Sequence, residues 1–232
     1  ASDRPNFVWI LSEDNSKHFL KLFDDHGAET PNIAKLANEG IVFNHAFSNS
    51  PVCSVARTTL ITGIYAPRIG TQYHRKIHSI SLPDDWKMFP AYLNEAGYYT
   101  TNNSKKDYNA DETPNTWDES SKKATWRDRP EKSQPFFHMQ TFTDSHESSL
   151  HFSRKKMKNQ PTETDPETVF IPEYHPRTET FKYTYARYHD RIKVIDGKVG
   201  EVVAQLKEDG LLENTFIFYF GAHGGVLPGS KG

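Results

Sequence analysis

Near its beginning the chain reads Asn6-Phe7-Val8-Trp9-Ile10-Leu11, a continuous apolar run of strand length, and the acidic pair Glu13-Asp14 follows it. An uninterrupted apolar run is typical of a strand buried on both faces, as in a parallel sheet. Open α/β sheets bind their ligands at the carboxyl ends of their strands. The run therefore predicts a buried first strand that delivers two carboxylates to a ligand-binding edge. Taken alone, the pair could also be a solvated loop.

The rest of the chain alternates between apolar runs of strand length and segments with helical spacing. Thr30-Pro31-Asn32 opens a helix that Gly40 ends, because proline suits the first helical turn and glycine the residue after the last. We expect further helices over Phe89–Ala96 and Tyr185–Leu206, and further strands over Gly40–Phe43, Tyr98–Thr101, Pro135–Phe142 and Asn214–Phe220. This alternation predicts an α/β fold with a mainly parallel (mixed) central sheet flanked by helices.

Two long segments, Ala110–Ser133 and Ser148–Arg177, are charged, contain proline and show little periodicity. They are predicted to be long loops over an edge of the sheet, where substrate contacts often lie.

Composition excludes several classes of function. The net charge of −2 gives no bulk attraction to nucleic acid, and the single cysteine excludes an internal disulfide framework and a paired-cysteine metal site. No run of eighteen apolar residues is present, so no membrane span is expected. The chain starts at Ala1 without a charged and then apolar leader, which fits a cytosolic protein or a periplasmic or secreted one whose signal peptide has been removed.

The single cysteine, Cys53, lies in the run Pro51-Val52-Cys53-Ser54-Val55-Ala56-Arg57-Thr58-Thr59-Leu60-Ile61-Thr62-Gly63. Cys53 and Arg57 are four residues apart in a helix-compatible stretch, so they lie on one helix face and are expected to share a pocket. The alternative is a buried structural thiol beside a surface arginine, since free cysteine is among the most buried residue types.

The Cys53 run resembles the signature of the type I sulfatases of the alkaline-phosphatase-like superfamily, Cys-x-Pro-x-Arg followed by an apolar residue and Thr-Gly. Val55 stands where that family usually has proline or alanine. The resemblance implies that a formylglycine-generating enzyme oxidises Cys53 to formylglycine, and that the hydrated aldehyde attacks the sulfur of a sulfate ester and later expels sulfate. A plain thiol cannot perform that last step.

The resemblance extends to the polar residues that follow the other predicted strands. It implies metal ligands at Glu13, Asp14 and His223, with Ala222 at the position of a missing aspartate ligand. It also implies catalytic roles for Arg57, Lys105, His146 and Lys231, while Asp107 replaces a family histidine. Taken one at a time, these positions could be a polar turn, a surface histidine and a flexible glycine loop.

Physical chemistry supports this arrangement. A sulfate ester is a stable anion, so its hydrolysis needs concentrated positive charge around the sulfuryl oxygens. A hard divalent cation held by carboxylates supplies charge and orientation, which favours Ca²⁺. Ala222 removes one anionic ligand, and an imidazole such as His223 is a poor substitute for a hard cation. We therefore expect the chain as written to be impaired, by an engineered inactivating substitution or by natural degeneration.

The family continues past its closing Lys-Gly into a smaller subdomain with a short antiparallel sheet. We therefore interpret residues 1–232 as an N-terminal catalytic sulfatase domain and expect the remainder of the same protein as a partner.

The expected substrate is a sulfated polysaccharide or glycosaminoglycan, carrying O-sulfate or N-sulfate. His74, Arg75, Asp107 and the loop Trp117–Arg129 provide aromatic and charged groups that suit an anionic sugar, although they could equally be solvated loops. An arylsulfatase of broad scope is less favoured. Two other classes stay open: a metal-dependent phosphohydrolase or phosphodiesterase of the same superfamily, and a non-catalytic protein that binds sulfated glycans on a sulfatase scaffold.

Overall fold

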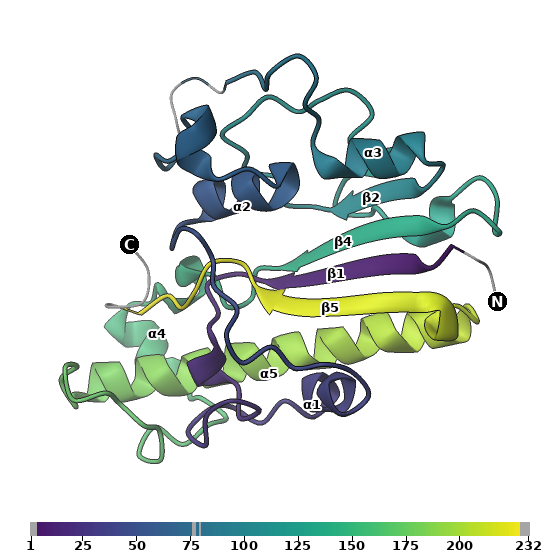
Figure 1. Cartoon of the computed structure of the whole chain (residues 1–232). Helices are drawn as coiled ribbons and strands as arrows, with labels where there is room; N and C mark the ends of the chain where they lie inside the picture. Colours follow the sequence, from purple (N-terminus) through teal and green to yellow (C-terminus); the bar gives the residue numbers. More distant parts are fainter. Residues whose placement is uncertain (1–3, 76–77, 79, 228–232) are drawn as a thin grey trace.

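The computed structural model describes residues 4–75, 78 and 80–227, and it is built around one five-stranded sheet (Figure 1). The strands lie in the order β3-β2-β4-β1-β5, and every pair is parallel. Their bounds are β1 Asn6–Ser12, β2 Tyr99–Asn103, β3 Glu119–Ser120, β4 Phe136–Phe142 and β5 Thr215–Gly221. The predicted parallel α/β fold is confirmed.

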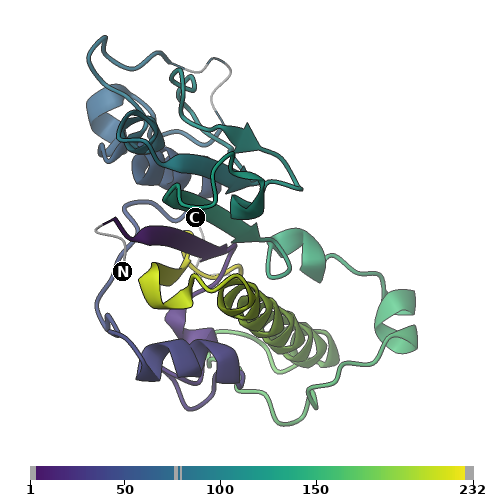
Figure 2. The same ribbon diagram turned by 90° about the vertical axis from the view of Figure 1, so that its right-hand side faces the viewer.

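Helices cover both faces of the sheet, with α2 and α3 on one face and α1 and α5 on the other (Figures 1 and 2). Their bounds are α1 Pro31–Asn38, α2 Cys53–Thr62, α3 Phe89–Glu95, α4 Arg154–Asn159 and α5 Glu179–Glu208. Short 3₁₀ helices occupy Lys17–Phe19, Ala66–Ile69, Trp126–Asp128, Glu147–Leu150 and Leu212–Asn214.

The core has a layer on each face of the sheet. On the α5 face, Val8 and Ile10 of β1 pack in one cluster with Ile192 and Ile195 of the helix, all fully buried. On the other face, Trp9 packs edge-on against Phe137, with ring centroids 5.3 Å apart. Burying each such side chain contributes about 1.5–3 kcal/mol. Both faces of β1 are therefore covered, as its unbroken apolar run predicts.

The helix α5 is longer than predicted. It begins at Glu179 because the side chain of Thr178 accepts a hydrogen bond from the backbone N–H of Phe181 and caps the first turn. Apolar periodicity starts only further along, since the first turns of α5 extend past the sheet and need no continuous apolar face.

The predicted strand at Gly40–Phe43 is wrong. Residues 41–43 have no regular structure, and the side chains of Ile41 and Phe43 are 81% and 70% exposed. The strand β5 forms one end of the sheet, and within the described residues this segment has no strand beside it. Apolar β-branched and aromatic residues favour a strand, but only a neighbouring strand can satisfy its backbone groups.

The segment Ala110–Ser133 is not the plain loop that the sequence predicts, because it contains the short strand β3 and a 3₁₀ helix. The indole of Trp126 is buried and donates to Asp209 at the end of α5, 2.8 Å away. The chain then enters β5 at the amino end of the sheet. The predicted sugar contact of the loop Trp117–Arg129 is therefore wrong for its Trp126 and Arg127, which lie at the opposite end of the molecule from Cys53.

Candidate active site

Three segments bring their polar residues together at the carboxyl ends of the central strands. Glu13 and Asp14 follow β1, His223 follows β5, and Cys53 is the first residue of α2. All four residues are buried, and one potential ligand atom from each lies within 4.8 Å of the others. The structure thus joins four residues that the sequence places up to 210 positions apart, and they form a possible metal site.

The imidazole of His223 lies at the centre of this cluster. Its Nε2 atom is 3.1 Å from Cys53 Sγ, 3.1 Å from Asp14 Oδ1 and 4.0 Å from Glu13 Oε2. Burial lowers the pKa of His223, but the hydrogen bonds to Asp14 and Cys53 and the charge of Glu13 outweigh it and raise the pKa to about 9. His223 is therefore protonated at neutral pH, and its buried Nδ1 has no hydrogen-bond partner among the described residues.

The carboxylate of Glu13 is held by two cations. Arg57 Nε donates to its Oε1 at 3.1 Å, with a second bond from Nη2, and Lys105 Nζ donates to its Oε2 at 2.5 Å. Burial raises the pKa of Glu13, but the charges of Arg57 and Lys105 outweigh it and lower the pKa to about 2. Arg57 also donates to Thr141 Oγ1 at 3.1 Å. The site therefore fixes both basic groups before any ligand arrives.

The turn after β1 is positioned by hydrogen bonds from the segment that follows β4 and from α5. Glu147 N–H donates to Asp14 Oδ2 at 2.7 Å, Ser145 donates to the Glu13 carbonyl, and Tyr188 of α5 donates to the Asp14 carbonyl. Asp14 has a φ of 48°, which is uncommon for a residue other than glycine. These hydrogen bonds stabilise Asp14 in a backbone conformation that residues other than glycine disfavour, and so they fix the positions of the two carboxylates.

The rim of the cluster contains the predicted substrate-binding residues. His74 Nδ1 lies 3.0 Å from Ser54 Oγ, which also accepts the backbone N–H of Arg75 at 3.0 Å. The guanidinium of Arg75 pairs with Asp107 through contacts of 3.3 and 3.4 Å. The rim segment around residue 75 is thereby tied to the residue after Cys53.

His146 and Lys231 fare differently. His146 immediately precedes Glu147, whose N–H binds Asp14, and its Nδ1 lies 3.0 Å from Ser148 Oγ. His146 is thus next in sequence to a residue that contacts Asp14. Its own side chain contacts Ser148, two residues further along the chain. The predicted catalytic Lys231 lies outside the described residues.

Ala222 lies beside the cluster but contributes no polar side chain. Its N–H donates to the Ser12 carbonyl at 2.9 Å, and its methyl group packs in an apolar cluster with Leu11 and Phe137. Calcium takes six to eight oxygen ligands. Here both oxygens of Glu13 already bind cations, and His223 and Cys53 offer nitrogen and sulfur. The residues present therefore do not form a calcium shell.

Sequence reasoning missed several residues that position the site: Ser54, Thr141, Ser145 and Tyr188. Tyr188 lies one helical turn before Ile192, so its position in the sequence predicts only a core side chain. In the structure its hydroxyl also donates to the Asp14 carbonyl. Ser54 follows Cys53 directly, and that adjacency is the one signal that could have pointed to it.

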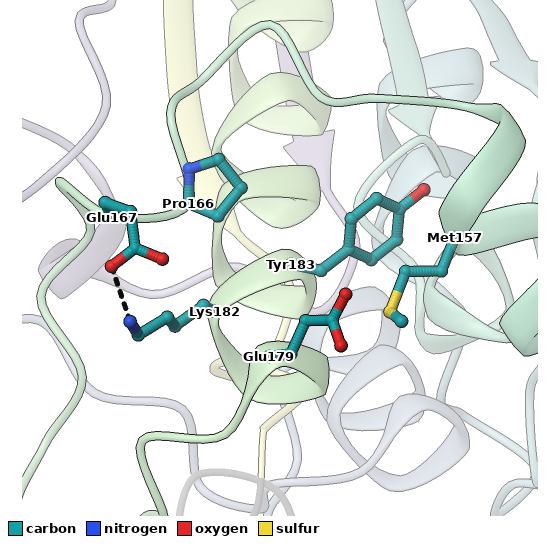
Figure 3. Close-up of a pocket in the computed structure, with 6 residues that line it drawn as sticks. All are labelled: Met157, Pro166, Glu167, Glu179, Lys182 and Tyr183. Atoms are coloured by element: carbon teal, nitrogen blue, oxygen red, sulfur yellow. Dashed lines mark hydrogen bonds and ion pairs between the residues drawn. The ribbon is translucent and has the colours of Figure 1, made fainter.

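A separate hollow of about 220 Å³ lies on the outer side of the first turns of α5 (Figure 3). Its walls are formed by Met157, Pro166, Glu167, Glu179, Lys182 and Tyr183. Lys182 is paired with Glu167 across it. None of these residues belongs to the Cys53 cluster, so the hollow is not the site of its chemistry.

Solved structures with this fold were found by comparison. The yidJ protein of Bacteroides fragilis has a TM-score of 0.74 and 19% identity over 98% of this chain and 63% of its own. The phosphonate monoester hydrolase of Agrobacterium radiobacter has a TM-score of 0.69 and 16% identity over 98% of this chain and 66% of its own. The chain thus has the alkaline-phosphatase-like fold.

The family follows from sequence. Residues 5–232 match the model of the sulfatase family, and the chain belongs to that family. It is 34% identical over 271 residues to the ulvan-active sulfatase of Formosa agariphila, an alignment that covers 99% of this chain and 45% of that protein. The chain therefore spans less than half the length of this relative. Among the described residues, no helix combines the length and apolar character needed to cross a membrane.

Proposed function

We propose that the protein to which this chain belongs hydrolyses sulfate esters of a sulfated polysaccharide, with Cys53 as the precursor of a formylglycine nucleophile. The observation that carries the proposal is the convergence of Cys53 with Arg57, Lys105 and the two carboxylates at one buried end of the sheet. A formylglycine-generating enzyme is the maturation partner that this proposal requires.

The roles of the chain's own residues follow from their charge. Arg57 and Lys105 are fixed cations beside Cys53, and they suit the binding of the sulfuryl oxygens of an anionic ester. His146 and Lys231 are proposed as further donors. When present, the hydrated aldehyde supplies one hydroxyl to attack sulfur and a second whose oxygen expels sulfate after the sugar alcohol has left.

A sulfated glycan is the substrate class that the rim and the relatives support. The relative from Formosa agariphila is named for activity on ulvan. His74, Arg75 and Asp107 form a polar rim in which an arginine fork faces a carboxylate, and such a fork also suits a sulfate or uronate group. Substrates that carry O-linked sulfate and substrates that carry N-linked sulfate are both to be tested.

The metal-binding residues of the site lack one ligand of the family pattern, at Ala222. By resemblance, we propose that the family's calcium site corresponds to Glu13, Asp14, His223 and position 222, and that Ala222 leaves this ligand set incomplete in the present chain. Ala222 leaves that cation one oxygen ligand short, so this chain binds calcium poorly and turns over slowly. Ala222→Asp is expected to raise calcium affinity by about tenfold or more and to raise sulfate release with it.

The test uses the full-length protein produced with a formylglycine-generating enzyme. Mass spectrometry of the Cys53 peptide first measures conversion, expected as a loss of about 18 Da. Sulfate release is then measured from ulvan, from heparin-like chains and from a simple aryl sulfate, for the parent and for Ala222→Asp. The control is Ala222→Ser, which offers a hydroxyl but no charge.

The outcomes separate the proposed classes. Sulfate release by the converted Ala222→Asp variant that exceeds release by Ala222→Ser supports the sulfatase. Hydrolysis of phosphate diesters without sulfate release would favour a phosphohydrolase instead. Binding of the sulfated glycan with no hydrolysis of any ester would favour a glycan-binding protein.

The surface beside β5 supports the proposal that residues 1–232 are the N-terminal catalytic part of a longer protein. β5 is an end strand of the sheet, and its Phe216 and Phe218 are 57% and 43% exposed. Exposed apolar strand edges are normally covered. We propose that the remainder of the same protein covers this edge.

We also propose that the enzyme acts in the periplasm or outside the cell, because polysaccharide substrates are accessible there.

A further inference from the structure

The side chains around His223 combine three kinds of donor atom. They offer one sulfur from Cys53, one imidazole nitrogen from His223 and carboxylate oxygens from Asp14 and Glu13. Thiolate and imidazole are donors that select zinc and similar transition metals, whereas calcium prefers oxygen alone. The donor set therefore disagrees with the cation that the family resemblance implies.

The geometry of His223 gives a second, independent indication. Cys53 Sγ and Asp14 Oδ1 both lie 3.1 Å from the same atom, His223 Nε2. Nε2 carries at most one hydrogen, and one N–H cannot point directly at both neighbours. A cation lying between the three atoms would satisfy all of them at once.

The separations match a tetrahedral ion. Metal–ligand bonds of about 2.0–2.3 Å at tetrahedral angles place neighbouring ligand atoms about 3.4–3.6 Å apart. The distances from Nε2 to Cys53 Sγ and Asp14 Oδ1 are 3.1 Å, and the distance to Glu13 Oε2 is 4.0 Å. Changes of about half an ångström would bring these three distances to that spacing, and the remaining separations among the four atoms are within 4.8 Å.

Charge also fits a divalent ion. With a thiolate at Cys53 and the carboxylates of Glu13 and Asp14, the negative charges of the cluster outnumber the two cations Arg57 and Lys105 by one, which attracts a metal cation. All four residues are at most 3% exposed, so water competes poorly for the ion. Binding forms the sulfur–metal and nitrogen–metal bonds as the Cys53 thiol proton and the Nε2 proton of His223 leave to solvent, and no group changes oxidation state.

We propose that, while Cys53 carries a thiol, this cluster binds a thiophilic divalent metal ion of the zinc class in preference to calcium, with Cys53, His223 and Asp14 as ligands. Glu13 Oε2 is nearest to the fourth position. The inference does not depend on the proposed hydrolysis. Conversion of Cys53 would remove the sulfur ligand, so the same residue controls both the nucleophile and the metal preference.

The test uses Co²⁺ as the probe, since a thiolate bound to Co²⁺ gives a near-ultraviolet charge-transfer band. The protein is untagged, reduced and produced without the maturation enzyme, and its mass confirms the thiol. We expect one equivalent of Co²⁺ to saturate the band, one equivalent of Zn²⁺ to abolish it, and a large excess of Ca²⁺ to leave it unchanged.

Cys53→Ser and His223→Gln are the test variants. Cys53→Ser removes the band, and each substitution lowers Co²⁺ affinity by about 100-fold or more, because even losing a group that supports a ligand lowers metal affinity 10–100-fold. The matched control is His151→Ala, which removes an exposed histidine outside the cluster and leaves the band and the affinity unchanged.

Circular dichroism verifies that the variants fold. If the variants do not fold, the spectrum of the parent protein tests the proposal. Absence of the sulfur-to-metal band in the parent overturns it. Loss of the band at Ca²⁺ concentrations similar to that of Co²⁺ also overturns it, as does a band retained in folded Cys53→Ser. Because sulfate release is measured on converted protein, failure of the proposed hydrolysis leaves this result untouched.

Discussion

Two arginine–carboxylate pairs lie at opposite ends of the sheet and differ in their exposure to water. At the carboxyl ends of the strands, Arg57 pairs with Glu13, and their side chains are 1% and 0% exposed. At the amino ends, Arg127 pairs with Asp209, and their side chains are 41% and 22% exposed. The chemistry of the two pairs is the same, but only the first has lost its water.

This difference separates a functional arrangement from a structural one. Removing an ion from water costs several kcal/mol, so a buried pair is a poor way to gain stability, whereas an exposed pair contributes about 0–1 kcal/mol. The pair of Arg57 and Glu13 lies beside Cys53, where fixed charge can serve a ligand. The pair of Arg127 and Asp209 instead ties a loop to the end of α5.

The largest expected effect is that of Arg57→Ala. It leaves the buried Glu13 with Lys105 as its remaining hydrogen-bonded cation, and we expect the free energy of unfolding to fall by about 3–5 kcal/mol. Urea unfolding followed by circular dichroism measures this change. A loss below about 1 kcal/mol would mean that the carboxylate reaches water, and the contrast between the two ends would then fail.

Acid provides the next largest effect. Glu13 has a pKa of about 2 in the folded protein against an ordinary value of 4.5 in the unfolded chain, so its contribution to stability is present above about pH 4.5 and is lost as pH falls towards 2. The loss amounts to about 3 kcal/mol. It is measured as the free energy of unfolding across this pH range.

Glu13→Gln is the variant that isolates this effect. It removes the Glu13 part of the loss between pH 4.5 and 2, whereas Asp24 and Asp209, whose pKa values are also lowered in the folded protein, still contribute. It keeps a separate loss between pH 6.5 and about 4, because burial lowers the pKa of His138 to about 4 and the neutral ring is the folded form. An identical pH profile in parent and variant would contradict the assignment to Glu13.

The smallest expected effect is that of Arg127→Ala. Its partners, Asp209 and Glu208, are held at 2.9 and 2.7 Å but stay in contact with water, so we expect a loss of about 0–1 kcal/mol. Added salt is expected to shrink this loss further, because exposed pairs are screened. Equal costs for Arg127→Ala and Arg57→Ala would remove the distinction between the two ends.

The sequence predicted the strands β1, β2, β4 and β5 and the convergence of Glu13, Asp14 and His223, because both depend on short-range patterns. A buried parallel strand is an apolar run, and residues after such strands meet at one edge of the sheet, so Glu13, Asp14 and His223 could be placed together. A helix that carries Cys53 and Arg57 was likewise predicted from the run that ends at Gly63, which has a φ of 68° and follows the last residue of α2.

Long-range pairing explains the failures. Gly40–Phe43 has strand composition, but a strand needs a neighbour, and composition does not say whether one is present. Arg127 and Trp126 look suited to a sugar, yet their partner is Asp209, more than 80 residues away. The pairing of Glu13 with both Arg57 and Lys105 was equally hidden, because no local pattern encodes which charges meet.

The one thiol of this chain is also a natural reporter of motion. Cys53 is 1% exposed within the cluster, so a thiol reagent can reach it only when the surrounding segments separate. In unconverted protein, the labelling rate therefore measures the free energy of that local opening, with no signal from elsewhere in the chain. The labelling rate of Cys53 thus also reports how often the site opens to solvent.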